Sequence, residues 1–569
     1  MKKMARILSM VLALCMMASI VTIPAIAEED YREPIELTVF SELANFAGEQ
    51  TGWYAKELKD RFNVTLKFVS SNLDPNAYAA GVSAGELGDI INLGDMGEHF
   101  VESLKAGLLY DLSELDMTPY TNLAGTLESQ AKVTEFAKGA TELDGVWGFT
   151  FDIGHEKDGW SDLTNPSYAL QVRYDAWAKA GMPEVATLED LPAFLKALQD
   201  AVPENEGGEK VYAYGGFSDW EDCVMKFTWD LMTFYGYQEF DFMGVNYATG
   251  DIVNPLEDGS LYYRALKVNN ELYRQGLFDP ESVSQNFDTY SQKLAGGRYL
   301  MALWGWIINQ YNTNDRAEAE VGFTTFLVGD AKPVMQTIST AGGNRLWALG
   351  ADCEYPERAM EIINWIASEE GIIVGEYGPQ GLTWDYDENG VPYMLDFGWS
   401  CYEERKETEM PAENGGGTFE DGMNAFNNTI YKLHQNALGK EYSYHVEGWA
   451  SYAERYDSNL SKAWQANYAN GAANGVELYR ETEQVSIAPS ASITYAKAAL
   501  SDDGNAKRAM FAPVMKQFSW QCVMAETEEQ FEALWNEMVT TCKSYGYDDV
   551  AAEKLVDIQN CLDFIEANK

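Results

Sequence analysis

Short strand-like segments alternate with amphipathic helical segments along the first part of this chain. Residues 35–40 alternate apolar and polar side chains, 53–62 place apolar residues on one helical face, and 64–68 return to the strand pattern. A third strand is predicted at 89–93, followed by a helix near 97–106. Strands that are separated by helices form a parallel sheet with helices on both faces. This order therefore predicts an α/β fold.

The rest of the chain extends this pattern and then becomes mainly helical. Further strands are predicted at 168–173, 299–304, 321–327 and 345–349, and helical spacing dominates from about 420 onward. The 569 residues exceed what one ordinary hydrophobic core organises, so at least two domains are expected. The hydrophobic content of 46% is that of a globular protein rather than a disordered chain.

The beginning of the chain has the pattern of an export signal. Lys2, Lys3 and Arg6 precede an apolar run over 7–23, which ends in the small-x-small sequence Ala25-Ile26-Ala27. The run is short for a stable membrane span, which is the alternative interpretation. We therefore predict a signal peptide at 1–27 and an exported protein that is extracellular or associated with the cell surface.

A lipid anchor on Cys15 is a second interpretation of the same segment. Leu14 does not fit the small residue that should precede a lipidated cysteine, and apolar sequence continues well past Cys15. Cleavage after Ala27 is therefore favoured over lipidation of Cys15. The sequence has no other apolar run long enough to span a membrane.

The chain is strongly acidic. It carries 40 Lys and Arg against 89 Asp and Glu, and loss of the three basic leader residues takes the formal charge from −49 to −52. Such a polyanion is not expected to bind nucleic acid or an anionic membrane surface by electrostatics. It would also repel an acidic ligand unless a local basic pocket overrides the overall field. A high net charge also increases the solubility of an exported protein, and it has little effect on the binding of neutral ligands.

Five segments, in a fixed order, resemble those of the extracellular solute-binding proteins (family 1) of ABC importers. Within this family, the resemblance is to the long Gram-positive proteins that bind oligosaccharides. They are Glu86–Asn92 with Gly107–Leu112, Leu143–Phe149, Val172–Met182 with Thr187–Leu191, Phe287–Trp306, and Tyr377–Trp384 with Tyr386–Gly390. Each motif is weak by itself, whereas the shared order covers nearly the whole mature chain. The chain departs from the family pattern at the leader, where the expected lipoprotein cysteine is missing.

The resemblance implies a two-lobe, type II periplasmic-binding-protein-like fold, in which hinge strands cross between the lobes and the C-terminal region is helical. The N-terminal lobe is expected to comprise 31–150 and 327–375, and the C-terminal lobe 151–326 and 376–569. The implied function is that of a non-enzymatic substrate-binding component of an ABC importer. It would bind a carbohydrate, in particular an oligosaccharide, in the interlobe cleft and deliver it to the transmembrane subunits of a permease.

The resemblance also implies a monomer without a cofactor. Two alternatives stay open at this point. One is a secreted carbohydrate-active enzyme, such as a glycosidase or lyase, and the other is a binding protein for a non-sugar solute such as a peptide. A paired acid placed across the cleft would distinguish the enzyme from the binding protein.

Ligands of α/β folds bind beyond the carboxyl ends of strands, and aromatic rings suit the apolar faces of sugars. The candidate ligand-binding residues either lie at such strand ends or offer an indole ring: Phe40, Glu42, Asp95, Arg173, Trp220, Trp304, Trp306, Asn344 and Trp384. Of these, Trp304 and Trp306 are the strongest pair, because Gly305 between them leaves room for a close approach. Each indole could instead belong to a core, and each charge to a surface ion pair.

Catalytic and metal-binding motifs are missing from the sequence. The four histidines show no HExxH or HxH spacing, and there is neither a GxSxG elbow nor a phosphate-binding glycine loop. Besides Cys15 of the leader, the sequence has six widely spread cysteines without a CxxC pair, and we expect these to be mainly buried free thiols. The acidic segment 203–210 is too irregular for a calcium cage. We predict no catalytic residue and no metal site.

Overall fold

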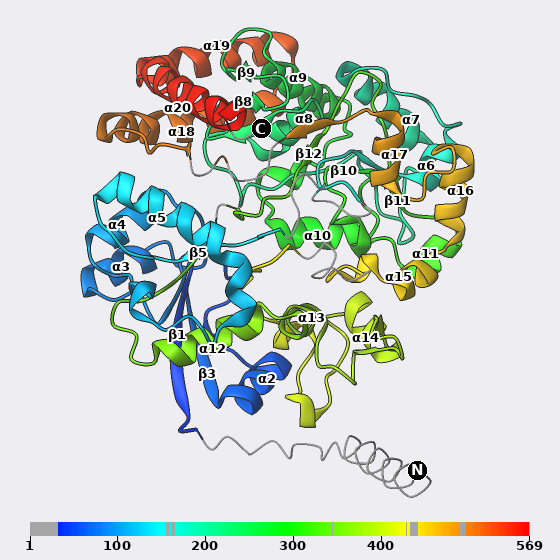
Figure 1. Cartoon of the computed structure of the whole chain (residues 1–569). Coiled ribbons are helices and arrows are strands. Elements are labelled where there is room, and N and C mark those ends of the chain that lie inside the picture. Colours follow the sequence, from blue (N-terminus) through cyan, green and yellow to red (C-terminus); the bar gives the residue numbers. More distant parts are fainter. Residues whose placement is uncertain are drawn as a thin grey trace, which may run out of the picture.

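A computed structural model shows two lobes, one above the other in Figure 1. It describes residues 32–154, 160, 165–343, 345–427, 429–432, 442–488, 493 and 496–567. Among these residues, no helix combines the length and the apolar character that crossing a membrane requires. The two-lobe α/β architecture that the sequence predicts is confirmed.

The lower lobe is built on a six-stranded sheet in the order β2-β3-β1-β4-β13-β5. Its strands are β1 (Ile35–Ser41), β2 (Gly48–Glu49), β3 (Val64–Ser70), β4 (Ile90–Leu93), β5 (Phe149–Thr150) and β13 (Leu346–Leu349). The central strand β1 runs parallel to β3 and to β4, so that Val39 pairs with Phe68 on one side and with Ile90 on the other. The strand β13 returns from much later in the sequence and pairs antiparallel with β4 and β5.

Neighbouring residues of β1 enter different cores, because successive side chains of a strand point to opposite faces. Leu37 and Val39 pack under α2 (Gly52–Phe62), α12 (Pro356–Ile366) and α13 (Glu369–Tyr377). Phe40 belongs to the second core, on the face covered by α3 (Ala77–Ala84), α4 (Glu98–Lys105) and α5 (Leu127–Thr141). Burial on both faces explains the nearly continuous apolar run of the β4 strand.

The described part of the upper lobe includes two small antiparallel sheets. One has the order β10-β6-β11, and the other β7-β8-β9. Their bounds are β6 (Gln171–Arg173), β7 (Gln238–Phe240), β8 (Met243–Asn246), β9 (Asp251–Val253), β10 (Met301–Ala302) and β11 (Phe323–Thr325). The helices around them are α6 (Tyr174–Lys179), α7 (Leu191–Ala201), α8 (Lys226–Thr233), α9 (Leu261–Arg274), α10 (Phe287–Ala295) and α11 (Asn314–Glu318).

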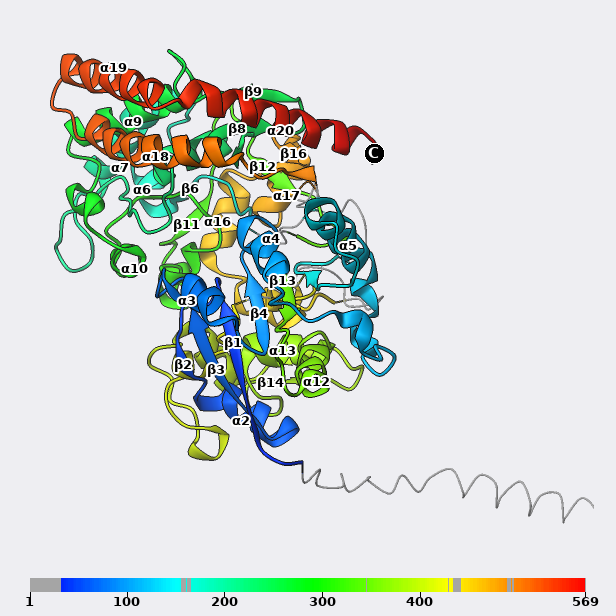
Figure 2. The same ribbon diagram turned by 90° about the vertical axis from the view of Figure 1, so that its left-hand side faces the viewer.

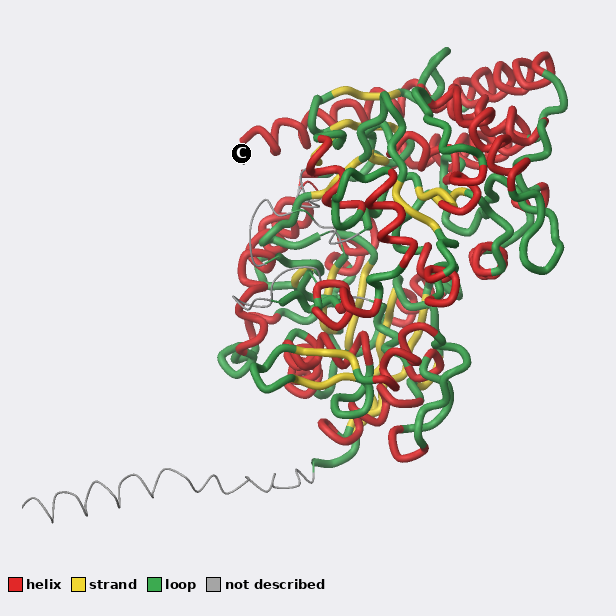
Figure 3. Tube along the Cα trace, turned by 90° about the vertical axis from the view of Figure 1, so that its right-hand side faces the viewer, coloured by secondary structure: helices red, strands yellow, loops and turns green. Residues whose placement is uncertain are grey.

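The helical C-terminal region completes the upper lobe, as Figure 3 shows at its top. It comprises α16 (Asn459–Asn467), α17 (Gly475–Thr482), α18 (Asp502–Val523), α19 (Glu528–Ser544) and α20 (Tyr547–Ala567). Asn270 of α9 anchors this region, because its side-chain amide donates to the carbonyls of Cys522, Val523 and Ala525 at 2.7–3.1 Å. The apolar residues at helical spacing on α19 face the same core.

The lobe boundaries differ from those expected from the sequence. Residues from 376 to 456, expected in the upper lobe, pack into the core of the lower lobe. Trp53 of α2 stacks on Phe419 at 5.2 Å and donates its indole N–H to the Phe419 carbonyl. Conversely, β12 (Val334–Gln336) pairs with β16 (Ser486–Ala488), and Val334 belongs to the upper core. Helical spacing indicates that a segment has a buried face, but not which core buries it.

Among the described residues, the chain passes from one core to the other three times. These crossings follow Ile153, lie between Val334 and Leu346, and lie between Tyr456 and Leu460. Ile153 forms parallel bridges with both Ser339 and Tyr431, so the first two crossing segments and Tyr431 of the lower lobe lie side by side. The six cysteines of the described residues are buried free thiols, in agreement with the sequence-based expectation.

Candidate functional site

The carboxyl ends of β1, β3 and β4 point toward the upper lobe (Figure 2). The loops that follow β1 and β4 therefore lie at the edge of the lower lobe that faces the upper lobe, and we call their residues Glu42, Asp95 and His99 the polar rim. Glu42 accepts a hydrogen bond from the Gly94 amide at 2.6 Å and pairs with Nδ1 of His99. The loop after β4 thus fixes the carboxylate that follows β1, at the strand ends where α/β folds bind ligands.

His99 completes this rim, although the sequence analysis did not select it. Its ring stacks on Tyr78 with centroids 3.7 Å apart, and 45% of its side chain is exposed. The hydrogen bond that Nδ1 of His99 donates to the Glu42 carboxylate raises the pKa of His99. The signal that could have selected it is its position in the first turn of α4, directly after the loop that follows β4.

Asp95 and Phe40 have different roles at this edge. Asp95 is exposed, and its Oδ1 accepts from the Gly97 amide at 2.7 Å, which closes the tight turn before α4. Phe40 is buried against Tyr78, with ring centroids 6.0 Å apart, so it supports the rim from below. Of the two predicted residues, Asp95 therefore faces solvent and Phe40 does not.

The upper lobe contributes an aromatic platform, defined by Trp220, Phe287, Trp304 and Trp306. The Trp304 and Trp306 rings stack at 5.5 Å, and Trp220 lies 4.6 Å from Phe287 and 6.4 Å from Trp306. Trp220 and Trp306 are 47% and 48% exposed, whereas Trp304 is 3% exposed. The structure thus brings together three of the predicted residues: Trp220 and Trp306 as exposed rings and Trp304 as their buried support. Phe287 was not among the predicted site residues.

Gly305 explains how two neighbouring indoles can serve different functions. A Cβ at this position would lie 2.4 Å from the Pro166 carbonyl oxygen, so only glycine fits beside that backbone. The sequence analysis expected the glycine to leave room for the ligand. In the structure its space is taken by the Pro166 backbone, and the close packing holds the Trp304–Trp306 turn in place.

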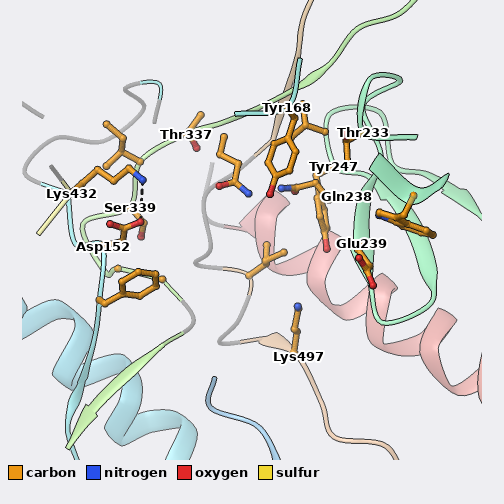
Figure 4. Close-up of a pocket in the computed structure, with 18 of the residues that line it drawn as sticks. Asp152, Tyr168, Thr233, Gln238, Glu239, Tyr247, Thr337, Ser339, Lys432 and Lys497 are labelled. Carbon is orange, nitrogen blue, oxygen red and sulfur yellow. Dashed lines mark hydrogen bonds and ion pairs between the residues drawn. The ribbon is translucent and has the colours of Figure 1, made fainter. Parts of the chain in front are cut away.

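A cavity of about 300 Å³ lies where the two lobes meet, and we call it the junction cavity (Figure 4). The segments around the first two crossings contribute Phe151, Asp152 and Ser339 to its lining, and the lower lobe contributes Lys432. Tyr168, Lys226, Glu239, Tyr247 and Lys497 are among the lining residues of the upper lobe. Lys226 also connects it to the platform, since its ammonium lies 6.0 Å from the Trp304 ring centroid.

Ion pairs and burial set the charges of this cavity. Lys432 pairs with Asp152 at 3.0 Å, and Lys226 pairs with the fully buried Asp230. Burial opposes the charge of Lys226, but Asp230 outweighs it and raises the pKa of the lysine. Burial raises the pKa of Glu239 to about 7, even though its side chain keeps contact with solvent in the cavity. None of these residues had a signal in the sequence, because they come from segments far apart.

Arg173 is a structural residue rather than an open one. Its guanidinium is buried, forms an ion pair with Asp175 at 2.6 Å, donates to the Gly297 carbonyl, and lies 5.0 Å from the Tyr311 ring centroid. The end of β6 therefore packs into the upper lobe instead of facing the cleft.

Trp384 is likewise part of a core. It is 0% exposed, its indole N–H donates to the Gly378 carbonyl at 2.9 Å, and its ring packs edge-on against Tyr386. It offers no ring face to a ligand in this structure. Asn344, the remaining predicted residue, lies outside the described residues.

The acidic clusters of the described chain are neutralised by arginine. Asp222, Cys223 and Asp241 lie close together, but Arg508 donates to Asp241 at 2.8 Å and pairs with Asp222. Burial also raises the pKa of the Cys223 thiol, which opposes the thiolate that a metal would need. In segment 203–210, Glu206 and Glu209 pair with Arg316 and Arg298. These groups therefore serve the fold.

The described chain thus has two α/β lobes that are joined by three crossings, with a cavity where the lobes meet. No protein-family model and no curated protein sequence matches this chain. Among solved structures, the substrate-binding protein FusA of Streptococcus pneumoniae in complex with kestose has a TM-score of 0.61 at 14% identity and covers 94% of this chain and 100% of that one.

Two further solved structures have the same fold. The alginate-binding protein AlgQ2 without calcium ion has a TM-score of 0.59 at 15% identity, covering 93% of this chain and 98% of that one. The human-milk-oligosaccharide (HMO) binding solute-binding protein of Bifidobacterium longum infantis has a TM-score of 0.58 at 13% identity, covering 93% and 99%. At these identities the likeness establishes the fold.

Proposed function

We propose that this protein is the extracellular substrate-binding component of an ABC importer and that it binds an oligosaccharide between its lobes. The observation that carries the proposal is the aromatic platform: Trp220 and Trp306 are about half exposed, and Trp304, which stacks on Trp306, lies 6.0 Å from the ammonium of Lys226 in the cavity lining. Large apolar rings held open at a cleft suit the C–H faces of sugar rings. The solved structures that share the fold include proteins described as binding kestose, alginate and human milk oligosaccharides, which supports the choice of a carbohydrate.

In this proposal the two lobes contribute different contacts. The platform stacks on the sugar, and Glu42, Asp95 and His99 hydrogen-bond its hydroxyl groups from the opposite lobe. Because neither set surrounds a ligand alone, the sugar favours a conformation in which the lobes approach each other. The transmembrane subunits of the permease then recognise the closed form of a monomer.

The leader completes the proposal. Export through residues 1–27 with cleavage after Ala27 gives a mature chain that starts at Glu28, without a lipid on Cys15. Intact-mass measurement of the mature protein tests this directly. A mass that corresponds to a lipidated chain starting at Cys15 would contradict cleavage after Ala27, while leaving the binding function untouched.

The binding function is tested by titrating the mature protein with a panel of neutral and acidic oligosaccharides in a calorimeter. We expect at least one to bind, and Trp306→Ala to weaken that binding about tenfold or more. Tyr545→Ala, which removes an exposed ring at the end of α19, is the matched control and should leave the affinity unchanged.

Chromatography of the same mixtures separates binding from catalysis. A binding protein returns the oligosaccharide intact, whereas shortened products would favour the secreted enzyme. If short peptides bind and no sugar does, the solute class is wrong. If Trp306→Ala and Tyr545→Ala bind a sugar equally well, the platform is not the site.

A further inference from the structure

The junction cavity differs in charge from the rest of the protein. Carboxylates outnumber Lys and Arg by 89 to 40 in the whole chain. Among the described residues that line the cavity, three lysines (Lys226, Lys432 and Lys497) face two carboxylates (Asp152 and Glu239). The excess of carboxylates over basic groups in the whole chain is therefore reversed in the junction cavity.

Two of the three lysines are neutralised by their own ion pairs, whereas Lys497 is not. Lys432 pairs with Asp152, as the dashed line of Figure 4 shows, and Lys226 pairs with Asp230. In the described part of the chain, no carboxylate lies within 4.0 Å of the Lys497 ammonium, which instead lies 4.8 Å from the Phe240 ring centroid. The charge of Lys497 lowers the pKa of Asp557, but the ion-pair partner of Asp557 is Lys554, at 3.7 Å.

The direction of Lys497 matters as much as its charge. Figure 4 shows its ammonium reaching into the cavity between the group of Asp152, Ser339 and Lys432 and the group of Tyr247, Gln238 and Glu239. The side-chain amide of Gln238 and the hydroxyl of Ser339 are neutral donors on either side. An anion in this space would have a cation and neutral hydrogen-bond donors around it.

The carboxylates of the cavity oppose an anion less than their number implies. Asp152 is compensated by Lys432 at 3.0 Å. Burial raises the pKa of Glu239 to about 7, with Asp230, Asp241 and Asp222 raising it further and Lys226 lowering it. Part of the Glu239 population is therefore neutral at physiological pH.

The net charge of the whole chain does not prevent such binding. At physiological ionic strength the screening length is about 8 Å, so distant carboxylates contribute little inside the cavity. A lysine in direct contact with the ligand is screened much less. The local arrangement of charges, rather than the total, thus decides whether an acidic ligand is accepted.

We propose that the junction cavity takes an anionic substituent, a carboxylate or a sulfate, of the bound carbohydrate, with Lys497 as its counter-ion. The inference rests on the proposed carbohydrate-binding function and makes it more specific: the ligand is an acidic oligosaccharide. Its neutral sugar rings stack on the platform, and its charged group enters the cavity beside Lys226.

The test compares matched acidic and neutral ligands. Calorimetry on the mature protein uses short oligomers of galacturonate and of mannuronate, their methyl esters, and a neutral galactose disaccharide with and without a sulfate ester. At least one acidic oligomer is expected to bind about tenfold or more tightly than its uncharged counterpart. Raising the salt concentration should weaken the acidic ligand only.

Variants assign the effect to Lys497. Lys497→Gln should lose the preference for the acidic ligand, while Lys497→Arg, which keeps the charge, should retain it. The control is Lys543→Gln, an exposed lysine on α19 whose nearest carboxylate oxygen is 4.0 Å away. It should behave as the unmodified protein does.

The inference and the proposed function fail in different ways. Equal binding of an acid and its ester, or equal behaviour of Lys497→Gln and Lys543→Gln, would overturn the acidic ligand and leave the importer function standing. Binding of neutral oligosaccharides with no acidic oligomer bound has the same meaning. Absence of binding by every sugar would overturn both.

Discussion

The polar rim of the lower lobe and the aromatic platform of the upper lobe are built from opposite chemistry. The rim consists of polar groups held by backbone amides, Glu42 by Gly94 of the neighbouring loop and Asp95 by Gly97 of its own loop. The aromatic platform of the upper lobe consists of rings that lie open, with Trp220 and Trp306 packed on Phe287 and Trp304. The groups of the rim can form directional hydrogen bonds, whereas the rings of the platform offer apolar contact area.

The largest expected effect is a loss of stability at Arg173, a predicted site residue that is buried rather than exposed at the rim or the platform. Arg173→Ala leaves the carboxylate of Asp175 buried without its ion-pair partner and should lower the free energy of unfolding by about 3–5 kcal/mol. Denaturant titration measures the loss. Lys462→Ala, which breaks an exposed ion pair with Asp457, is the control and should cost less than about 1 kcal/mol. Equal losses would mean that burial does not distinguish the two pairs.

The second prediction compares the buried and the exposed tryptophan of the platform. Trp304→Ala removes a buried indole and should lower the free energy of unfolding by about 3 kcal/mol, as truncation of a core tryptophan does. Trp306→Ala removes an exposed ring and should change it by about 0.5 kcal/mol or less. Both should weaken ligand binding, Trp304→Ala because Trp306 loses its support. A Trp306→Ala protein as unstable as Trp304→Ala would contradict the division into open and supporting rings.

A smaller effect is expected at the rim. Glu42→Gln removes the charge from the hydrogen bonds with Gly94 and His99 and should lower the free energy of unfolding by about 1–2 kcal/mol. Asp95→Asn keeps an oxygen for the Gly97 amide on an exposed side chain and should be nearly neutral. Nuclear magnetic resonance of His99 provides the specific readout, because its pKa should fall in Glu42→Gln and not in Asp95→Asn.

The smallest effect is the pH dependence of the same pair. The pKa of His99 is raised from 6.5 by the hydrogen bond with Glu42, so the charged histidine stabilises the folded state. This stabilisation is fully present below about pH 6.5 and is lost as pH rises through the raised pKa. Since His99 is partly exposed, less than about 1 kcal/mol is expected. Unfolding curves of the protein and of His99→Gln should therefore converge with rising pH, and a difference that grows would give the wrong sign.

Sequence patterns predicted local structure well because they record burial along one element. The alternation of Leu37 and Val39 with polar neighbours, and the apolar run of β4, follow directly from which faces are covered. The same patterns do not record which core covers them. The segment around Phe419 therefore joined the lower lobe against expectation, through its contact with Trp53.

The candidate site was predictable where one loop carries it. The rule that ligands bind beyond strand ends selected Trp304 and Trp306, and the structure places both in the aromatic platform. The rule also selected Arg173, because the Tyr311 ring and the Gly297 carbonyl that cover it come from distant segments. Lys497 and Lys226 meet only through tertiary packing, and no spacing in the sequence could bring them together.

The three crossings also govern the order in which the molecule can assemble during synthesis. The lower lobe lacks part of its core until Trp449 has been made, and the upper lobe lacks the partners of α9 until α18 and α19 follow. Neither half is complete when the ribosome has finished the first two thirds of the chain. Both cores are therefore completed late in synthesis, by segments from the last third of the chain.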